Sequence, residues 1–175
     1  WYNKLAGGQF ASHPGRPNVQ KGTFTAVDKS HSSTAHMPTT FDRTDEFYDF
    51  KNFNKDVKVL VTLDEKSYKD GKMGDYHPMA WYHEFDGGRS FYTEFGHTNE
   101  SFDDPNYLKH ILGGIKYAIG NGSKPDYSKA KSLNVPEDDR FTKNILAGGA
   151  FDEPTEIAIL PNLDILVSQR KGELM

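Results

Sequence analysis

Alternation of apolar and polar positions predicts a series of short strands in the first part of the chain. Four segments are rich in β-branched or aromatic residues, a pattern typical of strands: residues 23–27, 57–63, 77–85 and 89–95. The last two flank Asp86-Gly87-Gly88, whose residue types are those of a tight hairpin turn. We therefore expect residues 77–95 to form a β-hairpin within a sheet.

In the next segment, Pro105–Ile119, apolar residues recur at helical spacing. Asp103-Asp104-Pro105 places carboxylates and a proline at the expected helix N-terminus, and Gly120 ends the pattern. We expect this helix to pack on the sheet through a stripe of four residues: Tyr107, Ile111, Ile115 and Ile119. Gly113 and Gly114 lie within the helix. No lysine–serine pair or dinucleotide fingerprint follows them, so they indicate close helix–sheet packing rather than a phosphate loop.

A change of composition marks the end of this domain. Residues 121–139 are rich in Gly, Ser, Pro, Lys and Asp and contain few large apolar residues, which is typical of a linker. Beyond it, residues 141–146, 156–160 and 165–169 have the pattern of short strands. The predicted organisation is a domain at 1–120, a linker at 121–139 and a β tail at 140–175.

Composition and charge exclude several classes of function. The 175 residues fit one domain, or one domain plus a fragment. The net charge of −4 and the scattered basic residues give no electrostatic footprint for nucleic acid, and no apolar run approaches the length of a membrane span. Cysteine is absent, which excludes disulfides, thiolate metal sites and a cysteine nucleophile within these residues. Aromatic residues are abundant enough to build the core.

Three stretches of the sequence closely resemble one protein family. The stretch GRSFYTEFGHTNESFDDPNYLKHILGGIKYAIG is similar to the end of the ThuA-like (trehalose utilisation) domain, with its aromatic strand, GHT-type turn, acidic residue and helix ending in GGI. WYNKLAGGQFASHPG resembles the family's tryptophan-led helix, glycine pair and HP turn. DKSHSSTAHMPTTFDRTDEFYDF resembles its H-P-S-T, L-P and R-x-D-E-x-Y segment, with Ser32 and Met37 in place of the common proline and leucine. The resemblance covers roughly residues 1–120.

This resemblance implies an α/β fold, namely the C-terminal part of a flavodoxin-like, class I glutamine amidotransferase-like three-layer domain. In the family, a large part of the domain precedes the segment that matches Trp1. That part includes the turn where amidotransferases place their nucleophile, so the chain is expected to be a fragment and amidotransferase activity does not carry over.

The tail, FDEPTEIAILPNLDILVSQRKGELM, resembles the opening blade of a quinoprotein glucose/sorbosone dehydrogenase propeller. Pro161-Asn162-Leu163-Asp164 replaces the L-P-D-G turn of that family. Such propellers commonly follow ThuA-like domains in multidomain bacterial proteins. Analogy with them suggests a periplasmic or secreted location.

A first group of polar residues follows the predicted strand at residues 23–27. An unperturbed imidazole titrates near pH 6.5, so His31 is a candidate catalytic acid or base. Asp28 and Thr34 are candidates for binding sugar hydroxyls. The other polar members of the group are Ser32, Ser33 and His36. In the alternative interpretation, Asp28 and the Ser-Ser-Thr run cap a turn and have no other role.

A second group is Arg43-Thr44-Asp45-Glu46-Phe47-Tyr48, which matches the family's R-x-D-E-x-Y motif. The match suggests that Glu46 and Tyr48 face the same cavity as His31. Adjacent carboxylates point to opposite sides of an extended chain, so we expect one of Asp45 and Glu46 to enter the site, and we favour Glu46 as the catalytic carboxylate. Arg43 is at least as well explained as a structural clamp.

A third group is the GHTNES stretch at residues 96–101, where a strand ends. His97 and Glu100 are catalytic candidates because their spacing permits a common ligand if the loop coils, and Thr98 is a further candidate for substrate binding. In the alternative interpretation, His97 and Thr98 satisfy backbone groups, and an aspartate merely caps the following helix. We interpret His13, which precedes a proline, as a turn residue.

These groups lead to two hypotheses on function. If the strands before them are parallel, His31 and His97 lie at one carboxyl edge of the sheet and share one small polar ligand, with Glu46 or Glu100 beside them. An antiparallel neighbour would instead carry the His97 loop to the opposite edge. The first hypothesis is acid–base catalysis on trehalose or a related disaccharide or keto-sugar. The second is a non-catalytic carbohydrate-binding or docking module that serves a downstream propeller domain.

In both hypotheses the ligand is a small sugar. The residues show no cofactor fingerprint and no fixed metal-ligand spacing. We therefore expect neither a cofactor nor a metal.

Overall fold

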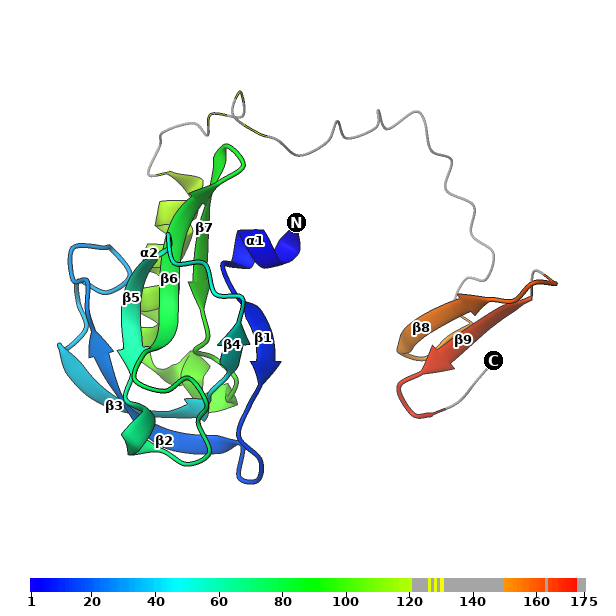
Figure 1. Ribbon diagram of the computed structural model, residues 1–175, viewed down its shortest axis with the longest axis horizontal. Helices are drawn as coiled ribbons and strands as arrows, with labels where there is room; N and C mark the ends of the chain where they lie inside the picture. The colour runs from blue at the N-terminus through cyan, green and yellow to red at the C-terminus, as the bar shows by residue number, and fades with distance from the viewer. Residues whose placement is uncertain (121–125, 127, 129, 131–149, 163, 173–175) are drawn as a thin grey trace. The chain divides into compact units, whose positions relative to one another are not determined.

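The computed structural model describes residues 1–120, 126, 128, 130, 150–162 and 164–172 (Figure 1). These residues fall in two compact units, Trp1–Ser132 and Leu133–Met175, which are described separately. Within the described ranges, no helix combines the length and the apolar character needed to cross a membrane.

A curled antiparallel sheet of five strands organises the first unit (Figure 1). The strands follow the order β3-β2-β5-β6-β7, and every neighbouring pair is antiparallel. Their bounds are Val19–Ala26 (β2), Thr40–Glu46 (β3), Lys58–Leu63 (β5), His77–Phe85 (β6) and Gly88–Thr93 (β7). The four predicted strands are present, and β3 has no counterpart among them. The fold is mixed α/β, as expected, but the strands of this sheet are antiparallel rather than parallel.

The β6–β7 hairpin has the predicted turn. Phe85 pairs with Gly88, so Asp86 and Gly87 are the two loop residues, with φ angles of 52° and 82°. Positive φ at both positions is the mark of a type I′ turn, whose twist matches that of the flanking strands. The turn thus fixes the register in which Trp81 lies opposite Tyr92 on one face of the hairpin.

The N-terminal helix and a small antiparallel sheet cover this Trp81 face. They are α1 (Tyr2–Ala6) and the pair of β1 (Gln9–Ser12) and β4 (Asp49–Lys51). The indole Nε1 of Trp81 donates to the carbonyl of Ala6 at 2.7 Å. Gly7 ends α1 with φ 85°, and a Cβ there would lie 2.6 Å from the indole nitrogen, so this close approach requires glycine.

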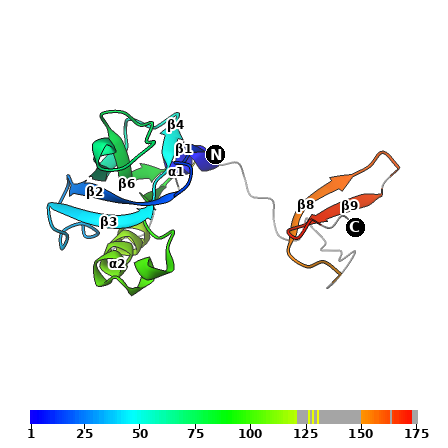
Figure 2. The ribbon, with the colours of Figure 1, turned by 90° about the horizontal axis from the view of Figure 1, so that it is seen from below.

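The helix α2 (Pro105–Ile119) has the predicted bounds and lies on the opposite side of the sheet from α1, β1 and β4 (Figure 2). At its N-terminus the Asp104 carboxylate accepts the backbone N–H of Asn106. At its C-terminus Gly120 has φ 83° and donates its N–H to the last turn. Two short 3-10 helices complete this unit, η1 (Glu65–Ser67) and η2 (Asn99–Asp103).

The face that α2 buries differs from the predicted stripe. Only the first two residues of the stripe reach the core, whereas Ile115 and Ile119 are 51% and 65% exposed. The buried residues of the helix are Tyr107, His110, Gly113 and Gly114. Cβ atoms on the two glycines would lie 2.4 Å from the backbone of Ser33 and 2.3 Å from the ring of Phe91. The close packing predicted for the glycine pair is confirmed, and it leaves no room beneath the helix for the larger isoleucines.

The hydrophobic core draws on every strand of the large sheet except β3 and β7, together with the loops between strands and α2. Its members are Phe24, Ala26, Met37, Phe47, Leu60, Val61, Leu63, Met79, Ala80, Phe95 and Tyr107. All of them precede residue 120, so the first unit contains its own core.

The second unit contains an antiparallel hairpin of β8 (Pro154–Ile159) and β9 (Ile165–Gln169). The strand predicted at residues 165–169 has the expected bounds, and the one predicted at 156–160 begins two residues earlier. The strand predicted at 141–146 lies outside the described residues. The exposed side chains along β8 show that the described part of this unit buries little of that strand.

Candidate functional site

The loop after β2 is a compact turn bonded to itself. Asp28 accepts hydrogen bonds from the hydroxyl and the backbone N–H of Ser30, and these bonds lower the pKa of Asp28. Thr34 is fully buried and donates its hydroxyl to the Asp28 carbonyl. Asp28 and Thr34, both candidates for substrate binding, thus hold the turn together, as in the structural alternative.

His31, in the same turn, lies among aromatic rings. Its ring stacks on Tyr82 with 4.5 Å between centroids and meets the edge of Tyr117 at 5.1 Å. Its Nδ1 lies 2.7 Å from the hydroxyl of Ser33, and burial lowers the pKa of His31. His110 of α2 donates from Nδ1 to the Ser33 carbonyl at 3.0 Å, which fixes the turn against the helix. His31 is therefore enclosed on the α2 side of the sheet.

The loop after β7 is arranged around one buried carboxylate. Asp45, which has no exposed surface, accepts the backbone N–H groups of Gly96 at 2.9 Å and His97 at 3.0 Å, and the Ser101 hydroxyl at 3.3 Å. Gly96 has φ 114°, and a Cβ there would lie 2.2 Å from the Tyr107 hydroxyl. The Asp45 carboxylate therefore fixes the backbone from which the His97 side chain projects.

Glu46 lies at the centre of a group of polar side chains from separate segments. Its Oε2 lies 2.9 Å from Nδ1 of His97, and its Oε1 lies 3.7 Å from Nδ1 of His13. Asn18 donates an N–H of its side-chain amide to Oε1 at 2.6 Å, and the Tyr48 hydroxyl interacts with the same carboxylate. We call these five residues the Glu46 cluster. The Glu46 side chain is 6% exposed, whereas the rings of His13 and His97 are 44% and 40% exposed.

The surroundings keep Glu46 ionised. Burial opposes its charge, but the hydrogen bonds from Asn18 and Tyr48 and the nearby imidazoles outweigh burial, so the pKa of Glu46 lies below its usual value. Burial and the Glu46 charge together raise the pKa of Tyr48 to about 12, so its hydroxyl remains a donor at neutral pH. Among the described residues, no group of three or more His, Asp or Glu side chains is arranged to hold a metal ion.

The structure brings Glu46, Tyr48 and His97 together and leaves His31 apart. His31 lies beside α2, whereas His97 pairs with Glu46 at the end of β3. The predicted convergence of the two histidines depended on parallel strands, and it does not occur because the sheet is antiparallel.

The remaining candidates of the third group belong to η2. Thr98 precedes this short helix, and its hydroxyl lies 3.0 Å from that of Ser101. Glu100 is exposed within η2. The carboxylate that orients the His97 ring is that of Glu46 and not that of Glu100.

His13 and Asn18 are members of the cluster that sequence reasoning misses. His13 does form a turn contact, with Nδ1 2.7 Å from the Pro14 carbonyl, but its ring also approaches Glu46. Both residues lie about thirty positions before Glu46 in the chain, so no local spacing connects them with it. The only sequence feature that pointed to His13 was the HP turn, which resembles that of the ThuA-like family.

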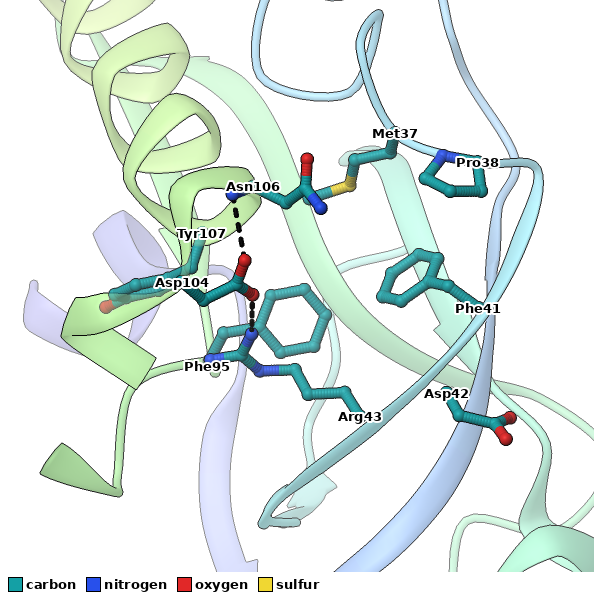
Figure 3. Close-up of a pocket in the computed structure, with 9 residues that line it drawn as sticks. All are labelled: Met37, Pro38, Phe41, Asp42, Arg43, Phe95, Asp104, Asn106 and Tyr107. Carbon is teal, nitrogen blue, oxygen red and sulfur yellow. Dashed lines mark hydrogen bonds and ion pairs between the residues drawn. The ribbon is translucent and has the colours of Figure 1, made fainter. Parts of the chain in front are cut away.

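Arg43 lines a small pocket between β3 and the beginning of α2 (Figure 3). Its Nε donates to Asp45 at 3.0 Å and its Nη1 to Asp104 at 2.8 Å, and its guanidinium lies 5.1 and 5.0 Å from the ring centroids of Phe95 and Tyr107. The pocket has a volume of about 120 Å³ and is lined by Met37, Pro38, Phe41, Asp42, Arg43, Phe95, Asp104, Asn106 and Tyr107. Arg43 thus clamps β3 to the beginning of α2, with its charge shared between two carboxylates.

The sequence of the first unit matches a known family. A family model described as ThuA, trehalose utilisation, matches residues 1–118. The chain belongs to the trehalose utilisation (ThuA) family. No curated protein matches it.

Two solved structures of ThuA-like proteins resemble the chain. One, from Bacteroides uniformis, has a TM-score of 0.56 and 24% sequence identity, covering 73% of this chain and 55% of that one. Another, from Parabacteroides merdae, has a TM-score of 0.47 and 18% identity, covering 71% of this chain and 47% of that one. The likeness to the first shows a shared ThuA-like fold. This chain spans about half the length of these two ThuA-like chains.

Proposed function

We propose that the Glu46 cluster binds a small sugar and that His97 exchanges a proton with it. The observation that carries this proposal is the pair of His97 and Glu46, in which a buried carboxylate lies 2.9 Å from Nδ1 while the ring is 40% exposed. With Nδ1–H donated to Glu46, a neutral imidazole leaves Nε2 as an acceptor. An imidazole oriented in this way is a general base, and the carboxylate stabilises the imidazolium that forms.

The proposed proton transfer uses only these two side chains. His97 Nε2 takes a proton from the carbon next to the carbonyl of a keto-sugar. The imidazolium then carries that proton beside the ionised Glu46. The same nitrogen returns a proton to the sugar, so the protein ends the cycle unchanged.

The surroundings of the pair suit a sugar ring. Asn18 and Tyr48 supply polar groups next to the carboxylate. Phe10 is 50% exposed, and its ring lies 5.2 Å from that of Tyr48 and 6.2 Å from that of His13. An apolar surface beside a few convergent polar groups matches a pyranose, which has C–H faces and a rim of hydroxyls. This supports trehalose or a related disaccharide or keto-sugar as the ligand.

The exposed Phe10 also favours a second function, a carbohydrate-binding or docking module without catalysis. The same aromatic surface and polar groups would hold a sugar whether or not His97 moves a proton. In this version the module presents the sugar to a downstream propeller domain.

The organisation of the longer protein is part of the same proposal. We infer that residues 1–120 are the C-terminal part of a flavodoxin-like ThuA domain, which the coverage of 55% of the Bacteroides uniformis chain supports. The β8–β9 hairpin would be the start of a sugar dehydrogenase propeller, since its sequence resembles the opening blade of that family. A periplasmic or secreted location would follow from such a fusion.

Proton exchange with solvent tests the catalytic function without knowledge of the net reaction. Binding of trehalose and of a keto-disaccharide is measured by calorimetry. The keto-disaccharide is also incubated with the protein in D₂O, and loss of its C–H signal next to the carbonyl is followed by ¹H NMR. His97→Asn keeps an amide N–H near the position of Nδ1 and removes the base. His36→Asn is the matched control, because His36 contacts the carbonyl of Asn106 in α2 and lies outside the cluster.

We expect His97→Asn to retain sugar binding and to lose exchange by about 100-fold or more, the contribution of a general base. His36→Asn should behave as the parent. Unchanged binding and exchange in His97→Asn would place the site elsewhere. Binding by the parent with no exchange above the buffer rate would establish the binding module in place of the enzyme.

A further inference from the structure

Tyr48 lies between two strands, where no regular ladder holds its backbone. β3 ends at Glu46 and β4 begins at Asp49, so Tyr48 belongs to a two-residue connection. Its side chain is part of the Glu46 cluster, because its hydroxyl interacts with the Glu46 carboxylate and its ring meets the edge of Phe10. The position of this ring therefore depends on what fixes the Tyr48 peptide groups.

Two buried side chains from the large sheet bind those peptide groups, one on each side. The Oε1 of Glu94, which follows β7, accepts the backbone N–H of Tyr48. The Nε2 of His77, the first residue of β6, lies 3.0 Å from the backbone carbonyl of Tyr48. Glu94 is 6% exposed and His77 is 1% exposed. Both side chains are buried, and both contact the cluster at the peptide groups of Tyr48.

The contacts of His77 define where its protons lie. A carbonyl oxygen can only accept, so Nε2 carries a proton and donates it to Tyr48. On the other side of the ring, Nδ1 lies 2.6 Å from Oε1 of Glu65 and 3.2 Å from the hydroxyl of Tyr68. The Tyr68 hydroxyl donates to the same Glu65 oxygen at 2.5 Å. Glu65 and Tyr68 thus hold the imidazole in the orientation that the Tyr48 carbonyl needs.

The chemistry of Glu94 also suits this role. Burial and the neighbouring carboxylates of Asp45, Asp49 and Glu46 raise its pKa well above the usual value and so favour the neutral acid. A neutral carboxyl group can accept the Tyr48 N–H without placing another charge beneath Glu46. The amide of glutamine has the same shape and an equivalent acceptor oxygen.

From these contacts we propose that His77 and Glu94 are positioning residues for the Glu46 cluster. They bind the backbone carbonyl and N–H of Tyr48 and so keep its hydroxyl next to the Glu46 carboxylate. This proposal rests on the proposed function for its biological meaning, since it concerns the same site. Its geometric content can be measured without any sugar.

The test titrates Glu46 by ¹³C NMR of its carboxyl carbon in the intact chain. Tyr48→Phe removes the hydroxyl and should raise the pKa of Glu46, because that hydrogen bond helps to lower it. Glu94→Met and His77→Leu remove the two hydrogen bonds to the Tyr48 backbone. Each should raise the pKa of Glu46 by at least half as much as Tyr48→Phe does. Glu94→Gln and His77→Gln keep an acceptor and a donor near the same positions and should remain close to the parent.

Urea unfolding of every variant separates positioning from mere stabilisation. If Glu94→Met and His77→Leu are less stable but leave the Glu46 titration unchanged, the two residues are structural and the proposal is wrong. An unchanged titration in Tyr48→Phe would also overturn it, because Tyr48 would then have no effect on Glu46. If Glu94→Met does not fold, Glu94→Asp replaces it, since the shorter acid withdraws its oxygen from Tyr48 while keeping the chemistry.

The outcome is independent of the proton-exchange experiment. A shifted Glu46 titration in a protein that binds no sugar would support the positioning role and reject the proposed function. If the parent exchanges sugar protons through His97 but Glu94→Met and His77→Leu leave the Glu46 titration unshifted, the proposed function is supported and the positioning role is rejected.

Discussion

The loops after β2 and β7 contain similar residues and lie in different surroundings. Each follows a strand and carries a histidine near serine and threonine side chains. In the first, His31 is enclosed by the rings of Tyr82 and Tyr117. In the second, Asp45 holds the backbone from beneath, and the His97 ring is 40% exposed beside Glu46. The comparison shows that polar composition identifies a loop as a candidate binding loop. Whether its histidine is buried in the core or exposed in a site depends on the elements that pack over the loop.

The first loop depends on the close approach of α2, and Gly113→Ala would break this approach. A Cβ at Gly113 would lie 2.4 Å from the backbone of Ser33, which cannot move aside as a flexible side chain can. We expect a loss of at least about 3 kcal/mol in the free energy of unfolding, measured by urea denaturation. Gly15→Ala is the control, because a Cβ there meets nothing within 4 Å. Equal stability of the two variants would show that α2 does not close over this loop.

Truncation of the two histidines should change the free energy of unfolding by different amounts. His31→Ala removes a ring stacked in a buried aromatic group and should cost about 2–3 kcal/mol. His97→Ala removes a partly exposed ring and should change the free energy of unfolding by less than about 1 kcal/mol. Chemical denaturation of both variants at pH 7 measures the difference. A similar loss in both would mean that His97 is as much a part of the packing as His31.

Acid should lower the free energy of unfolding, because His110, which fixes the first loop to α2, is buried as a neutral imidazole. Burial lowers the pKa of His110 to about 4, below the unfolded value of 6.5, so the unfolded chain takes up a proton before the folded chain does. Stability is thus fully present above pH 6.5 and is lost as the pH falls towards 4. Between pH 7 and pH 5 we expect His110 to contribute a loss of about 2 kcal/mol.

His110→Asn separates this contribution from that of other groups. The asparagine amide can still donate to the Ser33 carbonyl, as Nδ1 does in the parent, but it does not titrate. Urea unfolding at pH 7 and pH 5 should show a shallower pH dependence in this variant. The same pH dependence in variant and parent would rule out His110 as the cause.

The smallest effect is expected from removal of residues 121–175. Every member of the hydrophobic core cluster precedes residue 120, so the first unit should melt nearly as it does in the whole chain. Thermal unfolding followed by tryptophan fluorescence measures this, since both tryptophans lie in that unit. A large fall in the melting temperature would show that the tail is an integral part of the domain.

Short sequence patterns predicted those elements that depend on residues close together in the chain. The Asp86-Gly87 turn, the bounds of α2 and the packing role of its two glycines all follow from residue types at fixed positions. The strand β3 was missed because it is rich in polar residues, Thr40–Glu46 having one large apolar side chain. The carboxylates of Asp45 and Glu46 are buried by partners from distant segments, which periodicity cannot reveal.

The candidate site was predictable in part for the same reason. Glu46, Tyr48 and His97 were selected through their motifs, whereas His13 and Asn18 join them only through the folded backbone. His31 was placed with them on the assumption of parallel strands. Strand direction in this sheet depends on long-range pairing, such as that of β2 with both β3 and β5, which no local sequence signal specifies.

Arg43 has a consequence for the motions of the domain. Its guanidinium bonds to Asp104 at the beginning of α2 and to Asp45 beneath the His97 loop. Releasing either end would leave a largely buried charge with half of its compensation, which is costly. The first turn of α2 and the His97 loop should therefore open as one unit, with amide hydrogens that exchange with solvent at similar free energies.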